Sequence, residues 1–411
     1  MRDDLTPLSF MTLLIARRPV FDGGEKLFAY ELAVRQATDS SGIHQDVQPE
    51  QLLAEVFLGT GIETVAEAHT VFLTVSSDLL LDGKLRILPA DRVILEIPPG
   101  VAFDAELTKA CTELVSSGYR LAMHADDSSV NMKPLQLAHV IKVDVLSISV
   151  DGLPALTDRL RGHPGRLLAT NVHSSRAKDR CVACGFDLFE GYRFTAPETP
   201  TRKEIAVEHV LVFRVLKLVR DPKATDQQIE ELIQGNVGLA YKLLRMVNSA
   251  AMGGREVRSI GHALRLLGRE QVARWLAVLL VTDGGSKGVR AELTHLALVR
   301  ARMCELVAEL AVDANGSRGP LFLVGIFSVL DQLLEVPMVS LCDTIGVATD
   351  VRAALLDRAG VLGQVLRLVE GYVAGDWPSV ELMASAQEVD TEALQPLYLD
   401  ALSWATTQQP R

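Results

Sequence analysis

The sequence predicts an α/β fold that gives way to an all-α region: a closed (β/α)8 barrel followed by a domain made only of helices. Between residues 13 and 192, short β-rich runs alternate with amphipathic helical stretches. After Pro197 and Pro200 the strand signal disappears and helical periodicity continues. A chain of 411 residues also exceeds one ordinary core. We therefore expect two domains, residues 1–200 and 201–411.

The first half contains eight runs with strand character. They span residues 13–21, 27–34, 71–75, 93–97, 121–124, 140–145, 167–172 and 188–192. Amphipathic helical segments lie between several of these runs, at residues 49–58, 104–116 and 178–184. Strands that alternate with helices favour a largely parallel sheet, and this number of units favours a closed barrel.

The second half shows apolar residues at spacings of three and four. One such set is Leu293, Leu296, Val299, Met303, Leu306, Val307 and Leu310, and another is Leu362, Val365, Leu366 and Val369. This spacing is typical of one buried helix face. Ser259 is suited to cap the helix that follows it.

Charge and composition narrow the classes of function. The net charge of -11 argues against binding to nucleic acid or to acidic lipid, since both need a cationic face. No apolar run is long enough for a membrane helix, so we expect no membrane partner. The five cysteines have no framework spacing, which favours a reducing compartment, and we expect the cytoplasm.

Two stretches near the start of the chain resemble the opening of an EAL domain. They read IARRPVFD at residues 15–22 and FAYELAVR at residues 28–35, and the resemblance continues through residues 95–97, 141–144 and 185–192. It therefore covers the whole first half of the chain. The resemblance implies a modified TIM barrel and hydrolysis of cyclic di-GMP assisted by two hard cations, which require oxygen ligands.

The resemblance assigns a place to each polar residue of the barrel. Glu31 and Glu96 stand where the family has its two leading glutamates, and Lys142 and Asp144 are retained. The replaced positions are Thr74 for an asparagine, His124 and Ala125 for paired aspartates, Thr170 and His173 for glutamates, and Glu190 for a glutamine. Because these changes remove carboxylates, we expect weak metal binding, no metal site and no hydrolysis.

Two alternatives concern the same residues. A one-residue slip would bring Asp126 and Asp127 into the metal-site register and restore a phosphodiesterase, although the spacing from Gly118 fits the replaced pair better. Otherwise Glu31, Glu96 and Asp144 are polar residues at the mouth of a packed barrel, where Lys142 pairs with one of them to offset their repulsion.

Arg35 bears on ligand binding without hydrolysis. It matches the arginine that follows the family's signature, and the resemblance implies that it contacts a ligand phosphate. A ligand site would then consist of Glu31, Arg35, Glu96, Lys142, Asp144 and Glu190. This set supports a cyclic di-GMP receptor as the alternative to a protein that binds no nucleotide.

The second half resembles an HDOD domain, an all-α relative of the HD phosphohydrolases. The resemblance rests on LLRMVNSA at residues 243–250, SIGHALRLLG at 259–268, and the later segments 321–334 and 361–377. Ser328 and Val329 stand in place of the metal-binding His-Asp pair, and His295 is the one remaining imidazole at such a position. A hydrolytic metal centre needs several protein ligands, so we expect His295 to be an ordinary helix residue.

Two further patterns carry little weight. Cys181 and Cys184 form a single CxxC, and without a second pair they are more typical of packed helix cysteines than of a zinc site. A locally basic region is typical of a solvated helix face. It comprises Arg255, Arg258, Arg265, Arg269 and Arg274.

Taken together, two enzyme-like folds with eroded metal sites predict a non-catalytic bacterial signalling protein. We expect it to act through protein partners, with a homodimer left open, and to need no cofactor. The alternatives are a cyclic di-GMP receptor and a metal-dependent cyclic di-GMP phosphodiesterase.

Overall fold

The computed structural model describes residues 13–36, 62–126, 132–149, 151–172, 174–191, 206–248, 257, 259–282, 287–311, 314 and 317–408. The expected helix at 49–58 and the residues Asp127 and His173 lie outside these ranges.

Eight strands close into a barrel in chain order. They are β1 (Leu13–Asp22), β2 (Leu27–Gln36), β3 (Val71–Thr74), β4 (Val93–Ile97), β5 (Arg120–His124), β6 (Val140–Asp144), β7 (Arg166–Thr170) and β8 (Leu188–Glu190). The strands β2 to β8 run parallel, whereas β1 is antiparallel to both of its neighbours. The expected barrel is thus confirmed, with one reversed strand.

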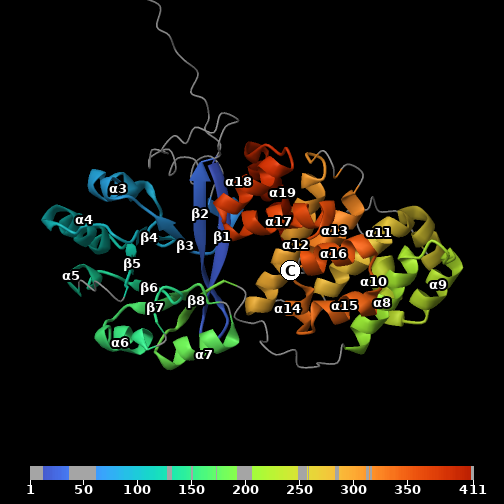
Figure 1. Cartoon of the computed structure of the whole chain (residues 1–411), viewed down its shortest axis with the longest axis horizontal. Helices are drawn as coiled ribbons and strands as arrows, with labels where there is room; N and C mark the ends of the chain where they lie inside the picture. The colour runs from blue at the N-terminus through green and yellow to red at the C-terminus, as the bar shows by residue number, and fades with distance from the viewer. Residues whose placement is uncertain are drawn as a thin grey trace, which may run out of the picture. The chain divides into compact units, whose positions relative to one another are not determined.

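Short helices follow most of the barrel strands (Figure 1). They are α2 (Ile62–Ala66), α3 (Ser77–Asp82), α4 (Ala105–Ser116), α5 (Met132–Leu135), α6 (Gly152–Arg159) and α7 (Ser175–Ala183), with a 3-10 turn at Lys84–Ile87. Side chains cap several of them: Asp104 accepts from the N–H of Leu107, and Ser174 accepts from that of Ala177. Such caps satisfy N–H groups that a helix leaves unpaired at its start.

The barrel interior is filled by one apolar side chain from each strand. This layer consists of Val20, Ala29, Phe72, Ile94, Ala122, Val140, Leu168 and Leu188. Because side chains alternate along a strand, the residue two positions away on each strand also points inward. The layer therefore fixes which polar residues meet above it.

The rest of the described chain is helical, as expected. The helices are α8 (Val207–Arg220), α9 (Asp226–Gln234), α10 (Val237–Val247), α11 (Ile260–Thr282), α12 (Gly288–Val307), α13 (Arg318–Phe327), α14 (Leu330–Leu334), α15 (Met338–Ile345), α16 (Thr349–Asp357), α17 (Gly360–Ala374), α18 (Trp377–Ala386) and α19 (Leu394–Gln408), with a 3-10 turn at Thr391–Ala393. The expected cap is confirmed, since the hydroxyl of Ser259 accepts from the N–H of His262. No helix in the described ranges is long and apolar enough to cross a membrane.

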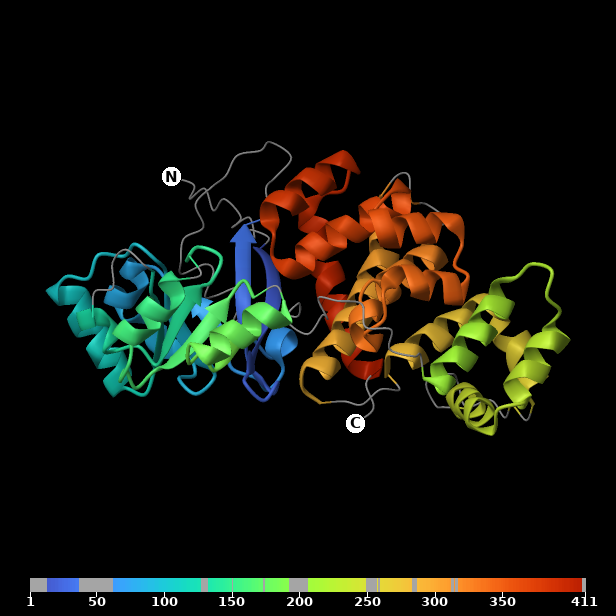
Figure 2. The same cartoon turned by 60° about the horizontal axis from the view of Figure 1, so that its bottom comes forward.

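The chain forms two compact units. The first contains the barrel together with Lys287–Glu292 and Leu368–Ser403, and the second contains α8 to α11, Leu293–Arg367 and the residues from Trp404 onward. The last helices before Ser403 are therefore part of the barrel unit. In Figures 1 and 2 the red helix α18 lies beside the blue pair β1 and β2.

Within the second unit, a half-buried ion pair joins three helices. The guanidinium of Arg274 pairs with the carboxylate of Glu305 and lies 3.9 Å from the ring centroid of Phe322. Arg302 binds the second oxygen of Glu305 at 2.8 Å. These contacts lower the pKa of Glu305 against the effect of burial and tie α11, α12 and α13 together.

Candidate functional site

A polar layer lies directly above the apolar layer of the barrel, at the carboxyl ends of the parallel strands. We call it the site layer: Arg18, Glu31, Thr74, Glu96, His124, Lys142, Thr170 and Glu190. Each member is two residues from an apolar-layer residue, counted forward on the parallel strands and backward on β1. Active sites of such barrels lie at this end of the strands. The site layer is therefore the candidate functional site.

Lys142 lies at the centre of the site layer. Its side chain is 2% exposed, and its Nζ is 2.5 Å from Oε2 of Glu31 and 2.8 Å from Oε2 of Glu96. Burial alone would lower the pKa of Lys142, but the two carboxylates raise it above its ordinary value. The buried ammonium is therefore held in its charged form.

Arg18 is the second cation of the site layer. Its guanidinium nitrogens lie 2.5 Å from Oε1 of Glu31 and 3.1 Å from Oε1 of Glu190. Burial lowers the pKa of Arg18, and the nearby carboxylates raise it overall. Its side chain is 35% exposed, whereas those of its two partners are nearly covered. Arg18 thus lies on the solvent side of the carboxylates.

Glu96 and Glu190 have opposite pKa shifts. Burial would raise the pKa of Glu96, but a hydrogen bond with His124 and the charge of Lys142 lower it to about 2. The Nε2 of His124 is 2.7 Å from Oε1 of Glu96. Burial and the neighbouring Glu31 raise the pKa of Glu190 to about 7. Three carboxylates thus share two full cations, and Glu190 is the one that holds a proton near neutral pH.

Not all of the expected ligand residues meet in the site layer. Asp144 is half-buried beyond it, and its Oδ1 accepts from the N–H of Leu146 at 3.0 Å. Arg35 forms an ion pair of 2.8 Å with Glu381 on α18. Glu31, Glu96, Lys142 and Glu190 do come together, so four of the six expected residues form one cluster.

The replaced positions can be located as well. His124 is the β5 member of the site layer, so the register favours the pair His124 and Ala125 over Asp126, whose side chain is exposed. Thr74 ends β3 and is exposed, and the hydroxyl of Thr170 donates to the carbonyl of Val143 at 3.4 Å.

Arg18 is the member of the site layer that sequence reasoning missed. The signal was its position two residues before Val20 on a strand that begins the barrel. The reversed direction of β1 makes the inward residue precede its apolar neighbour, and the strand pattern does not reveal that reversal.

The metal chemistry implied by the EAL resemblance can be tested on the donor set. The oxygens of Glu31 and Glu96 contact Lys142, and those of Glu31 and Glu190 contact Arg18. Among the residues that the structure describes, no group of three or more His, Cys, Asp or Glu side chains is placed to hold a metal ion. In this arrangement the cations of the protein itself occupy the carboxylates, so the site layer does not fit a divalent ion.

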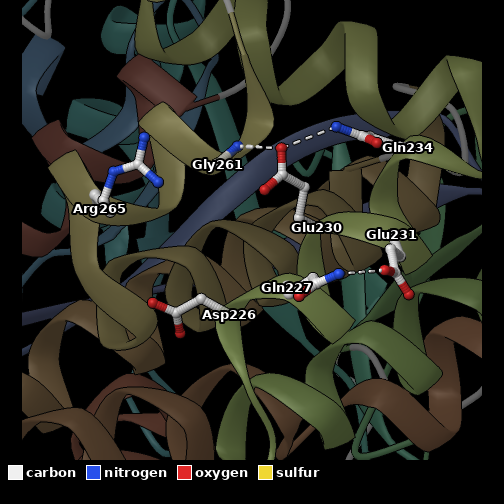
Figure 3. Close-up of a pocket in the computed structure, with 7 residues that line it drawn as sticks. All are labelled: Asp226, Gln227, Glu230, Glu231, Gln234, Gly261 and Arg265. Atoms are coloured by element: carbon white, nitrogen blue, oxygen red, sulfur yellow. Dashed lines mark hydrogen bonds between the residues drawn. The ribbon is translucent and has the colours of Figure 1, made fainter.

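A second candidate site is a pocket of about 480 Å³ in the helical unit (Figure 3). Its lining includes Asp226, Glu230, Glu231 and Arg265. Glu230 accepts from the backbone N–H of Gly261 at 3.0 Å, and Asp226 pairs with an arginine of α11. Two of its three carboxylates therefore already serve the packing of α9 against α11.

Ser328 and the two cysteines of the CxxC lie in surroundings that are typical of structural residues. Ser328 is buried, donates to the carbonyl of Gly325 and accepts from Arg300. Cys181 is buried, which raises the pKa of its thiol to about 11, and Cys184 is half-buried. A thiol with so high a pKa is protonated at neutral pH and is a poor metal ligand or nucleophile.

A family model for the HDOD domain matches residues 206–337. This match confirms the HDOD resemblance of the second half. The matched residues begin just before α8 and end before α15.

Two curated relatives match the chain almost from end to end. A protein of Vibrio cholerae named cyclic di-GMP phosphodiesterase CdgJ is 28% identical over 405 residues, which cover 96% of this chain and 92% of the relative. The uncharacterized protein YuxH of Bacillus subtilis is 25% identical over 405 residues, with 96% and 98% covered.

Solved structures that contain an EAL domain also match part of the chain. The YkuI protein of Bacillus subtilis, in complex with cyclic di-GMP and calcium, is 16% identical, with 55% of this chain and 71% of that chain covered and a TM-score of 0.37. The FimX EAL domain of Pseudomonas aeruginosa, bound to cyclic di-GMP, is 19% identical, with 44% and 89% covered and a TM-score of 0.33.

The relatives correct one expectation from the sequence. A non-catalytic protein that acts through protein contacts was expected, because the barrel exchanges several carboxylates for neutral residues. That expectation is wrong. A relative whose match covers 96% of this chain and 92% of its own length is named a cyclic di-GMP phosphodiesterase. The inference gave most weight to the lost carboxylates and interpreted the charged residues that remain as structural. The chain therefore has an eight-stranded barrel followed by a helical region in which residues 206–337 match the HDOD domain, and it resembles proteins that join an EAL domain to an HDOD domain.

Proposed function

We propose that the protein is a cyclic di-GMP phosphodiesterase and that the dinucleotide binds at the carboxyl ends of the barrel strands. The similarity to the Vibrio cholerae phosphodiesterase supports this, because it extends over both halves of the chain.

The observation that carries the proposal is the arrangement of charge in the site layer. Arg18, Glu31, Glu96, Lys142 and Glu190 come from five different strands and contact one another in one cluster. Such a cluster costs stability when it is buried, and charged groups kept at the active end of a barrel favour a functional role over a structural one.

The residues divide into those that face the ligand and those that hold them in place. Arg18 is the half-exposed cation of the site layer and is suited to contact a phosphate oxygen, as a guanidinium matches phosphate geometry. Arg35 contacts the second phosphate. Lys142 is covered, so it fixes Glu31 and Glu96 and contributes positive charge from below. Glu190 carries a proton near neutral pH, which limits the negative charge that an incoming phosphate meets.

The reaction consumes one water. The water oxygen forms a bond to phosphorus, the bond from phosphorus to one ribose oxygen breaks, and that oxygen leaves with a proton that the water supplied. The product is the linear dinucleotide. The carboxylates that would bind a divalent ion contact Lys142 and Arg18 in this arrangement.

Compartment and partners follow as proposals. The cytoplasm suits the cysteine usage, since cytosolic thiols stay reduced. Protein partners, a homodimer among them, remain a prediction, as does the linear division into domains 1–200 and 201–411.

The test uses the purified full chain with cyclic di-GMP in three buffers: one with a chelator, one with Mg²⁺ and one with Mn²⁺. Chromatography follows the linear dinucleotide, and calorimetry follows binding. We expect binding and product formation in at least one buffer. Binding without product formation in every buffer would show a cyclic di-GMP receptor and contradict the hydrolytic part of the proposal. The absence of both binding and product would contradict the whole proposal.

A further inference from the structure

We propose that the C-terminal segment Leu368–Ser403 forms one wall of the ligand site of the barrel and that Glu381 positions Arg35 there for a ligand phosphate. The inference rests on the proposed function, because it concerns the binding of the same dinucleotide. The sequence alone does not reveal this wall, because Glu381 lies far from Arg35 along the chain.

The segment packs on the face of β1 and β2 that carries the site layer. Ala16 and Ala33 are paired across β1 and β2, and each is two residues from a member of the site layer. By strand alternation they point to the same side as Arg18 and Glu31, one layer further out. A Cβ built on Gly375 would lie 2.5 Å from the Cβ of Ala33. The backbone at Gly375 therefore lies directly above the β1–β2 side of the site layer.

Side chains of α19 bind the backbone of β1. The N–H of Ile15 donates to Oε1 of Gln395 at 2.7 Å, and the N–H of Arg17 donates to the hydroxyl of Tyr398 at 3.3 Å. Tyr372 donates to the same Gln395 oxygen at 2.5 Å. All of these groups are buried, where an unmade hydrogen bond is costly. The segment thus fixes the strand that carries Arg18.

Arg35, near the end of β2, forms an ion pair with Glu381 of α18. Arg35 is four residues after Glu31 on β2, so alternation places it on the inward side. Its Nη2 lies 2.8 Å from Oε1 of Glu381, and each side chain is 29% exposed. A pair so exposed adds little stability, about 0–1 kcal/mol. The pair can instead orient the guanidinium of Arg35. A guanidinium has five N–H donors, so Arg35 can bind Glu381 and a phosphate at the same time.

The experiment measures cyclic di-GMP binding to the full chain by calorimetry, together with the steady-state constants. Glu381→Gln keeps the size of the side chain and removes its charge. We expect the Kd and KM to rise about 3- to 10-fold through lost orientation of Arg35, with kcat unchanged. Glu381→Asp, which restores the charge, recovers part of the affinity.

The matched control is Glu392→Gln, which changes an exposed glutamate in the same segment. We expect wild-type affinity from it. A second arm exchanges the two charges in the double variant Arg35→Glu with Glu381→Arg. That variant can pair again, so a purely structural role would restore binding, whereas the positioning role predicts weaker binding than in Glu381→Gln.

The outcomes separate the two proposals. Wild-type affinity in Glu381→Gln, or full recovery in the charge-exchanged variant, would overturn the positioning role and leave the proposed function intact. A wild-type chain that neither binds nor converts cyclic di-GMP would overturn the proposed function, and with it the ligand role of the wall.

Discussion

The ammonium group of Lys142 lies between Glu31 and Glu96, 2.5 Å from one carboxylate and 2.8 Å from the other, with 2% of its side chain exposed. This single side chain links β6 to β2 and β4 across the barrel. It neutralises carboxylates that would otherwise repel one another in a place where water cannot screen them.

Replacing Lys142 by Met should lower the free energy of unfolding by about 3–5 kcal/mol, because it removes the buried cation that Glu31 and Glu96 share. Urea unfolding measures the change. The control is Lys109→Met, which removes a lysine that is 78% exposed and pairs with Glu113; we expect a loss of about 0–1 kcal/mol there. Equal losses in the two variants would show that Lys142 has no special electrostatic role.

Glu190 predicts a dependence of stability on pH. Its pKa is raised to about 7 in the folded protein, so its contribution to stability is complete below the ordinary glutamate pKa and is lost as the pH rises through 7. The variant Glu190→Gln cannot ionise, and its stability should change less between pH 5 and about 8. Chemical unfolding across this range measures the difference. Parallel curves for the two proteins would contradict the raised pKa.

Glu96 predicts the opposite behaviour in acid. Its pKa is lowered to about 2, so its stabilising effect is complete above the unfolded pKa of about 4.5 and is lost as the pH falls toward 2. Replacing His124 by Ala removes the hydrogen bond that contributes most to this lowering. The acid unfolding midpoint should then move to higher pH, while Glu106→Gln, an exposed change on α4, should leave it in place. An unmoved midpoint in the His124 variant would refute the assignment.

The close approach of Gly375 to β2 can be tested with two alanine variants. Gly375 and Gly360 have nearly equal positive φ angles of 67° and 69°, but a Cβ meets Ala33 at 2.5 Å only in the first case. Both variants should lose about 1–2 kcal/mol from backbone strain. Gly375→Ala should lose about 1–3 kcal/mol more from overpacking, as measured by thermal or urea unfolding. Equal losses would mean that the wall is loosely packed.

The barrel was predictable from the alternation of strand runs and helical segments, and most of its site layer was predictable from the resemblance to EAL domains. The strand runs were recognisable, and the residues two positions beyond the apolar core, such as Glu96 and Lys142, fell at matching places. Arg18 was missed because local pattern does not reveal that β1 runs against its neighbours. The pairing of Arg35 with Glu381 was missed because it joins segments far apart in the chain, which no periodicity encodes.

The function was harder to predict than the fold because the charge of the site depends on side chains from several different strands. Counting the residues that replace metal ligands of the family, such as His124 and Thr170, predicted a barrel mouth without hydrolytic activity. The structure places three carboxylates, Lys142 and Arg18 in contact there, and the pairing of Lys142 with a carboxylate is as the sequence predicted. An interpretation that also weighed the charged residues that remain in the site layer would have retained catalysis as a hypothesis.

The measurement that tests the central claim most directly is the time course of linear dinucleotide formation from cyclic di-GMP by the full chain, beside the variant Lys142→Met at matched folded concentration. The account predicts steady product formation by the wild type and at least a tenfold lower rate, roughly 1.4 kcal/mol of lost transition-state stabilisation, in the variant. A wild-type rate no higher than that of buffer alone would contradict it.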